Sequence, residues 1–162
     1  MKNPIGLAVV LPVIFSGCAS IVHVPPEPYD VTRTIDLNEP YDMAWSKTIS
    51  WFADNNIKIG LIDKQSGLIQ SVSDLKSMPG VLDCGYFKYS YGGVVYVSKI
   101  ESVDVNVTVR KVDENTSRLR ANVFGYFQAN VLGQRDVSSF DSGRCESTGT
   151  LEEGILEYII NY

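Results

Sequence analysis

The strongest constraint on the fold is an alternation of valines in the second half of the sequence. Between residues 103 and 109 every second residue is valine, and the residues between them are polar. Side chains of a strand point alternately to its two faces, so this pattern predicts a strand with one buried and one wet face. Residues 119–127 repeat the alternation after the turn Asp113-Glu114-Asn115, which predicts an antiparallel partner.

Shorter runs of alternating residues predict further strands before this pair. Residues 29–37 and 94–97 suit single strands, and residues 57–61 and 68–72 flank the turn 63–67 as a hairpin. The stretch 73–85 contains Pro79-Gly80 and is predicted to be a loop.

Two helices are predicted from apolar residues at three- and four-residue spacing. The first opens at Pro40, because proline is favoured at the first helical position, and ends at Asn55-Asn56. The second covers the C-terminus, where Thr150 and Glu153 have capping-box spacing and Thr148 is a competing cap. The order of elements predicts an α+β domain over residues 30–162, with two helices packed on one face of a curved antiparallel sheet.

The N-terminus carries the features of an exported chain. Positive charge at Met1 and Lys2 precedes the apolar run 5–15, which is too short to span a bilayer. Ser16 and Gly17 then precede Cys18, and this resembles the lipobox of bacterial lipoproteins. The resemblance implies that residues 1–17 are a signal peptide and that acyl chains on Cys18 attach the mature chain to a membrane. The alternative is a secretory signal with another cleavage point, in which Cys18 is an ordinary residue.

Residue 19 is Ala and not the Asp that holds lipoproteins at the inner membrane, so the resemblance implies an outer-membrane protein facing the periplasm. Residues 18–29 contain three prolines, at 25, 26 and 28, and are predicted to form an extended tether. His23 is then expected to be a solvated linker residue.

Two cysteines remain once Cys18 is assigned to lipid. In an oxidising periplasm, Cys84 and Cys145 are predicted to form a disulfide bond. The alternative is a pair of buried free thiols.

The sequence offers little for catalysis or for nucleic-acid binding. The net charge is −5, so we expect no general attraction for nucleic acid or anionic lipid. Ser73-Asp74-Leu75-Lys76 matches S-x-x-K, but the chain has no K-T-G motif. His23 is the only histidine, and the carboxylates of Glu101, Asp104, Asp113 and Glu114 are expected to be solvated. No catalytic residue, metal site or cofactor is predicted.

The candidate interaction surface is rich in aromatic residues. Tyr86, Tyr89 and Tyr91 lie between glycines, and tyrosine is effective at interfaces because it buries a large ring and keeps a hydroxyl for hydrogen bonding. The alternative is that these tyrosines cover the sheet against the helices. Trp45 is predicted to be in the core, and Trp51, on another side of the first helix, is a second interface candidate if it is exposed.

Residues 38–45, with the run Pro-Tyr-Asp and a Trp, and residues 63–69, with the turn Asp-Lys-Gln-Ser-Gly, resemble the repeat unit of the BamC (NlpB) lipoproteins. That resemblance implies a helix-grip fold and a non-catalytic role in the envelope. This chain differs in having one such domain and a predicted disulfide, so a stand-alone lipoprotein of the same fold is expected.

These expectations combine into a non-catalytic, outer-membrane lipoprotein that acts as an accessory or scaffold by binding another envelope component, within a protein complex. The alternative is a small inhibitor-type or ligand-binding lipoprotein, which blocks a lysozyme or holds a lipid or glycan. A hydrolase is the third hypothesis.

Overall fold

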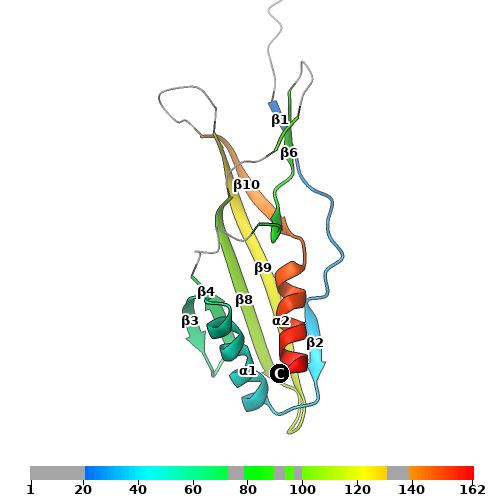
Figure 1. Cartoon of the computed structure of the whole chain (residues 1–162), viewed down its shortest axis with the longest axis vertical. Helices are drawn as coiled ribbons and strands as arrows, with labels where there is room; N and C mark the ends of the chain where they lie inside the picture. Colours follow the sequence, from blue (N-terminus) through cyan, green and yellow to red (C-terminus); the bar gives the residue numbers. More distant parts are fainter. Residues whose placement is uncertain (1–20, 73–78, 90–93, 97–99, 131–138) are drawn as a thin grey trace, which may run out of the picture.

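A computed structural model describes residues 21–72, 79–89, 94–96, 100–130 and 139–162. It shows an α+β arrangement in which a curled antiparallel sheet carries two helices on one face, as predicted (Figure 1). The strands are β1 (Ile21–Val24), β2 (Thr34–Leu37), β3 (Ile59–Asp63), β4 (Leu68–Ser71), β5 (Leu82–Asp83), β6 (Tyr86–Tyr89), β7 (Val94–Tyr96), β8 (Ile100–Lys111), β9 (Ser117–Asn130) and β10 (Ser139–Ser147). The helices are α1 (Tyr41–Asp54) and α2 (Thr150–Asn161).

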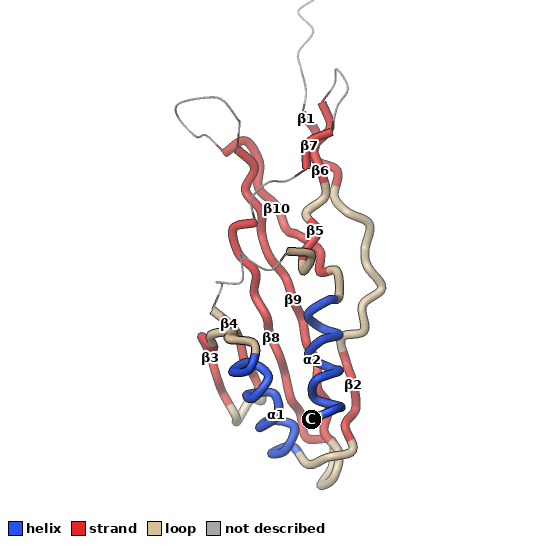
Figure 2. The backbone as a smooth tube through the Cα atoms, in the orientation of Figure 1, coloured by secondary structure: helices blue, strands red, loops and turns tan. Residues whose placement is uncertain are grey.

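The strands form one large and one small sheet. The large sheet has the order β3-β4-β8-β9-β10-β5, and β2 joins it by pairing with β9. The small sheet has the order β1-β6-β7 and lies at the end of the molecule where the described chain begins (Figure 2). All described strand pairs are antiparallel.

The predicted valine strand and its partner form the long central hairpin β8–β9. The four alternating valines pair with apolar residues of β9, for example Val109 with Leu119, and are at most 1% exposed. Both helices cover this apolar face. Phe52 of α1 and Ile155 and Ile159 of α2 are fully buried. The hairpin β3–β4 and the helix α1 also form where they are predicted, but β3 begins two residues later than expected, at Ile59, and Pro40 is the N-cap of α1 and not its first residue.

Two strands share one edge of β9 and leave a gap between them. β2 pairs with Ser117–Arg120, and β10 pairs with β9 from Gly125 onward. Within the gap, the N–H of Ala121 donates to the Arg33 carbonyl, and the N–H of Val123 donates to a carboxylate oxygen of Glu152 at 3.1 Å. Helix α2 therefore completes the hydrogen bonding of the sheet through one side chain.

The start of α2 differs from the prediction. The N-cap is Gly149, with φ of 92°, and no side chain caps the helix. The hydroxyl of Thr148 instead donates to the Gly80 carbonyl at 2.6 Å, and Thr150 is already helical. The capping box is wrong because the chain turns into the helix through a left-handed residue, a conformation that favours glycine.

Several strands were not predicted. β1 lies inside the expected tether, β5 lies inside the expected loop 73–85, β6 follows that loop, and β10 has no apolar alternation. The inward positions of β10 are small: a Cβ on Gly143 would meet the Phe127 ring at 2.7 Å, and the next inward residue is Cys145. Small residues leave room for that ring, so the usual apolar signal of a strand is missing.

Candidate functional site

The predicted interaction segment forms β6, the middle strand of the small sheet. Phe87 points inward and is 3% exposed, so Tyr86 and Lys88 lie on the opposite face. Tyr86 is half-buried, and the Lys88 ammonium lies 5.9 Å from the centre of its ring. Tyr86 does not cover the large sheet against the helices, because the small sheet lies away from both helices (Figure 2).

The paired face of β1 completes this surface. Val22 pairs with Lys88 and Val24 pairs with Tyr86, so the four side chains share one face. Val22 is 56% exposed. The resulting surface, here called the tyrosine face (Val22, Val24, Tyr86 and Lys88), combines apolar, aromatic and cationic groups. Aromatic residues such as Tyr86 are enriched in protein-binding surfaces.

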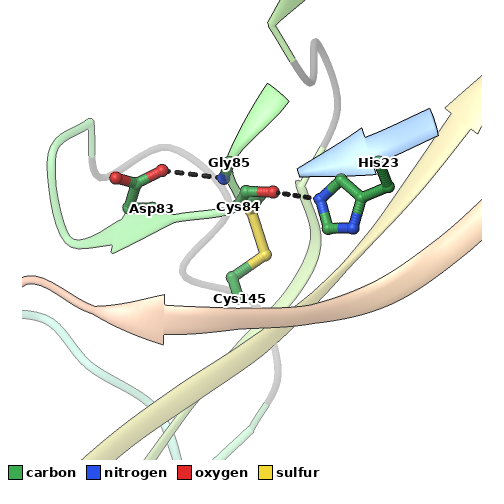
Figure 3. The surroundings of a disulfide bond; sticks show 5 residues. All are labelled: His23, Asp83, Cys84, Gly85 and Cys145. Atoms are coloured by element: carbon green, nitrogen blue, oxygen red, sulfur yellow. Dashed lines mark hydrogen bonds between the residues drawn. A yellow bond between two sulfur atoms is a disulfide. The ribbon is translucent and has the colours of Figure 1, made fainter. Parts of the chain in front are cut away.

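Beneath the tyrosine face, the disulfide Cys84–Cys145 connects the loop after β5 to β10 (Figure 3). The predicted bond is therefore confirmed, and the free-thiol alternative is wrong. Both cysteines are buried, at 6% and 1% exposure. The bond joins residues 61 apart in the sequence and fixes the loop that leads into β6.

His23 connects β1 to this disulfide loop. Its Nε2 lies 2.8 Å from the Cys84 carbonyl oxygen, and the carbonyl can only accept, so Nε2 carries the proton (Figure 3). The ring contacts those of Phe87 and Phe127, with centroid distances of 5.0 and 4.8 Å. The expectation of a solvated linker histidine is wrong, because residues 21–24 are a strand seated on the domain.

A second contact holds the chain after β1. Asp83 accepts hydrogen bonds from the Gly85 N–H and from the Tyr29 hydroxyl, each at 2.8 Å, and the second raises the pKa of Tyr29. Gly85 has φ of 72°, and a Cβ there would collide with the carbonyl oxygen of Val24. The expected tether is therefore fixed to the domain at Val24 and again at Tyr29.

Several other predicted site residues are not described by the structure, or only in part. Cys18, Tyr91 and the S-x-x-K segment 73–76 lie outside the described residues. Tyr89 is placed by its backbone, which pairs with Ile21.

Trp51 does not belong to an interaction surface. It is 3% exposed and packs edge to face on Phe52, with ring centroids 5.1 Å apart. Helix α1 packs on α2 as well as on the sheet, so more than one of its sides is buried. Trp45 is in the core at 7% exposure, as predicted.

The carboxylates also depart in part from prediction. Asp113 and Glu114 are exposed, but Asp104 is only 8% exposed and is buried, contrary to expectation. The side chain of Glu101 lies outside the described part.

Glu152, for which the sequence predicted no role, is fully buried. Its oxygens accept from the Val123 N–H and from the Ser147 hydroxyl at 2.7 Å, and Arg33 Nε lies 3.6 Å away.

A groove of about 380 Å³ lies where β2, α1 and the end of α2 meet. Lys47 is one of the lining residues, with its ammonium 2.7 Å from Glu39 Oε2 and 3.3 Å from the Ile159 carbonyl oxygen. The other oxygen of Glu39, Oε1, is buried and has no hydrogen-bond partner among the described residues. The apolar side chains that line the groove are Ile35, Leu37, Ile159 and Ile160.

Within the described ranges, no group of three or more His, Cys, Asp and Glu side chains is arranged to hold a metal ion. No helix in that part of the chain has the length and apolarity to cross a membrane.

Comparisons with known proteins identify no relative. No family model, no curated protein and no solved structure matches the chain. The resemblance to the BamC lipoproteins therefore stays a prediction.

Proposed function

We propose that the protein is a lipid-anchored envelope protein that acts without catalysis, as an accessory or scaffold that binds another envelope protein through the tyrosine face. The sequence around Cys18 supports export and acylation. The disulfide supports an oxidising compartment, because such bonds persist in the periplasm and are rare in the cytosol.

The observation that carries the proposal is the position of β1. This strand begins at Ile21, three residues after Cys18, and a chain of that length spans about 10 Å at most. Because β1 is seated on the domain through His23, the acyl chains on Cys18 would hold the small sheet close to the membrane. The partner would therefore be a protein that presents a surface near the same membrane.

The chemistry of the tyrosine face supports a protein partner. Tyr86 provides a large ring with two rotatable bonds, so it loses little entropy on binding, and its hydroxyl can hydrogen-bond. The neighbouring Val22 is exposed in the unbound chain and would be buried by a partner. Lys88 adds a cation, which favours an acidic site on the partner.

A photo-reactive amino acid at position 86 tests the proposal in intact cells. We expect irradiation to produce one discrete crosslinked band that contains another envelope protein. Met43 is the matched control, since it is 52% exposed and lies on α1, far from the small sheet (Figure 1). The same label at position 43 should give no such band.

A second variant shows whether the crosslink comes from specific binding or only from crowding of proteins at the membrane. Val22→Asp places a charge on the exposed side of β1 and should weaken the position-86 crosslink severalfold while the far-ultraviolet circular dichroism stays unchanged. Equal crosslinking from positions 43 and 86, or a band that Val22→Asp leaves intact, would contradict the proposal.

The groove supports a second candidate, the ligand-binding lipoprotein. Its apolar walls and the oxygen Glu39 Oε1, which accepts no hydrogen bond from the described part of the chain, suit a small molecule that has an apolar part and a hydrogen-bond donor. Native mass spectrometry of protein extracted under mild conditions tests this candidate. A retained small molecule that Glu39→Gln releases would support it, and a ligand-free mass would contradict it.

A further inference from the structure

Three arginines gather on the face of the large sheet that the helices leave uncovered. Arg120 pairs with Thr34 of β2 on one side and with Thr108 of β8 on the other. One step along the strands, Arg118 pairs with Asp36 and with Arg110. Directly paired residues share a face, so the six side chains form two adjacent rows across three strands.

The charges in this group are only partly balanced. Arg118 donates to both oxygens of Asp36, from Nε at 2.6 Å and from Nη2 at 2.8 Å. Asp36 therefore offsets one guanidinium. Among the residues that the structure describes, no carboxylate forms an ion pair with Arg110 or Arg120. The group has a local charge of +2 on a chain whose net charge is −5.

Five of these six residues line an open pocket. Its volume is about 340 Å³, and its lining is Thr34, Thr108, Arg110, Arg118 and Arg120. Guanidinium groups present several donors in a fixed planar fork, and threonine hydroxyls add donors that rotate. Every one of these side chains can donate to an anion placed between the two rows.

Two of the arginines carry like charges at directly paired positions of neighbouring strands. Arg110 is opposite Arg118, and like charges in such positions repel and destabilise a sheet. A bound anion would attract both guanidinium groups and so offset that repulsion. We propose that this pocket, the arginine pocket, binds a phosphate group, either as free phosphate or as the head group of a phospholipid.

Phosphate is favoured over a carboxylate by the number and arrangement of the donors. A carboxylate has two oxygens, and Arg118 already holds one such group in Asp36. A phosphate has more oxygens, pointing in different directions, so it can accept from Arg110, Arg120 and a threonine together. The proposal does not depend on the lipid anchor, because β1 and the β8–β9 turn lie at opposite ends of the molecule (Figure 1).

Calorimetric titration of the full chain in non-ionic detergent at low salt tests the site. The probes are inorganic phosphate and dihexanoyl phosphatidic acid, with acetate and chloride as controls. We expect phosphate-type probes to bind and acetate to bind much more weakly. Tighter binding of inorganic phosphate indicates a free phosphate ligand, whereas tighter binding of the short-chain lipid indicates a head group.

Variants locate the binding to this pocket. Arg110→Gln and Arg120→Gln should each weaken binding about tenfold or more, since each removes a charge-assisted hydrogen bond. Arg144→Gln is the matched control, because it removes the same charge from β10, where Arg144 is exposed opposite Tyr126 and outside the pocket. Asp36→Asn should tighten binding severalfold by freeing Arg118. Absence of phosphate binding, or an equal loss in Arg144→Gln, would overturn the proposal.

Discussion

The carboxylate of Glu152 accepts a hydrogen bond from the backbone N–H of Val123, on the edge of β9 away from β8 and at a point where neither β2 nor β10 pairs with it. β2 and β10 occupy the two ends of this edge, and the carboxylate fills the position between them. Its other oxygen accepts from the Ser147 hydroxyl, and Ser147 in turn accepts from the Gly149 N–H at 3.2 Å. One buried side chain thus connects the central strand, the end of β10 and the start of α2.

Replacing Glu152 with alanine should lower the free energy of unfolding by about 3 kcal/mol, because it leaves buried donors on Val123 and Ser147 without acceptors. Urea denaturation measures the change. Glu153→Ala is the control, since Glu153 is exposed one position further along α2, and it should change stability by less than about 0.5 kcal/mol. Equal effects of the two variants would contradict this role of Glu152.

The disulfide should account for a large part of the stability. Removing it through Cys84→Ser with Cys145→Ser should lower the free energy of unfolding by about 4 kcal/mol, since the bond closes a long loop in the unfolded chain. Thiol labelling of the unfolded, unreduced protein should find neither residue free. A reductant should reproduce the loss of stability in the wild-type chain. A free energy of unfolding that does not change when reductant is added would contradict the prediction.

His23→Ala should release β1 from the domain without unfolding the rest. The variant loses the bond to the Cys84 carbonyl and the contacts with two phenylalanine rings. Hydrogen exchange of the amides in β1 and β6 should accelerate about tenfold, while exchange in β8 stays unchanged. Val22→Ala, on the exposed face of β1, should have a much smaller effect. Unchanged exchange in His23→Ala would show that β1 is held by other contacts.

The contact between α1 and α2 should weaken at alkaline pH. The Tyr158 hydroxyl donates to Asp54 Oδ2 at 2.5 Å, and this bond raises the pKa of Tyr158 to about 12. An unfolded tyrosine has a pKa of about 10, so the stabilising effect is complete below pH 10 and is lost as the pH rises through about 12. Phenolate absorbance measures the titration. Asp54→Asn should move this tyrosine back toward its ordinary pKa, and an unchanged titration curve would contradict the assignment.

The parts of the fold that follow from local pattern were predictable. The valines of β8 and the alternation in β9 specify a two-faced hairpin, and the Asp63–Gly67 turn specifies the β3–β4 pair. Helix α1 follows from its apolar spacing and from Pro40. The cysteine pair follows from the compartment that Cys18 implies and from the absence of any other partner for Cys84 and Cys145.

The parts that depend on distant contacts were not predictable in this way. β10 is a strand because β9 offers a free edge and Phe127 needs small residues opposite, which no pattern in residues 139–147 reveals. His23 lies in a segment whose three prolines predict an extended tether, but its ring is bonded to the carbonyl of Cys84, 61 residues away. The burial of Glu152 could have been predicted from the sequence, because its spacing places it on the same side of α2 as the buried Ile155 and Ile159.

The arginine pocket also depends on register. Arg110, Arg118 and Arg120 are close in sequence, but only the pairing of β8 with β9 sets two of them opposite each other, and only β2 adds Thr34 and Asp36. Overall net charge hides such a group, since a chain of charge −5 can still carry a local cluster of cations.

The central claim is that Cys18 anchors a domain whose first strand is fixed close to the membrane. Intact-mass spectrometry of the protein extracted from cell membranes tests it most directly. The account predicts a mature chain that begins at Cys18 and carries acyl chains on that residue. A chain that retains residues 1–17, or one that begins elsewhere and has an unmodified Cys18, would contradict it.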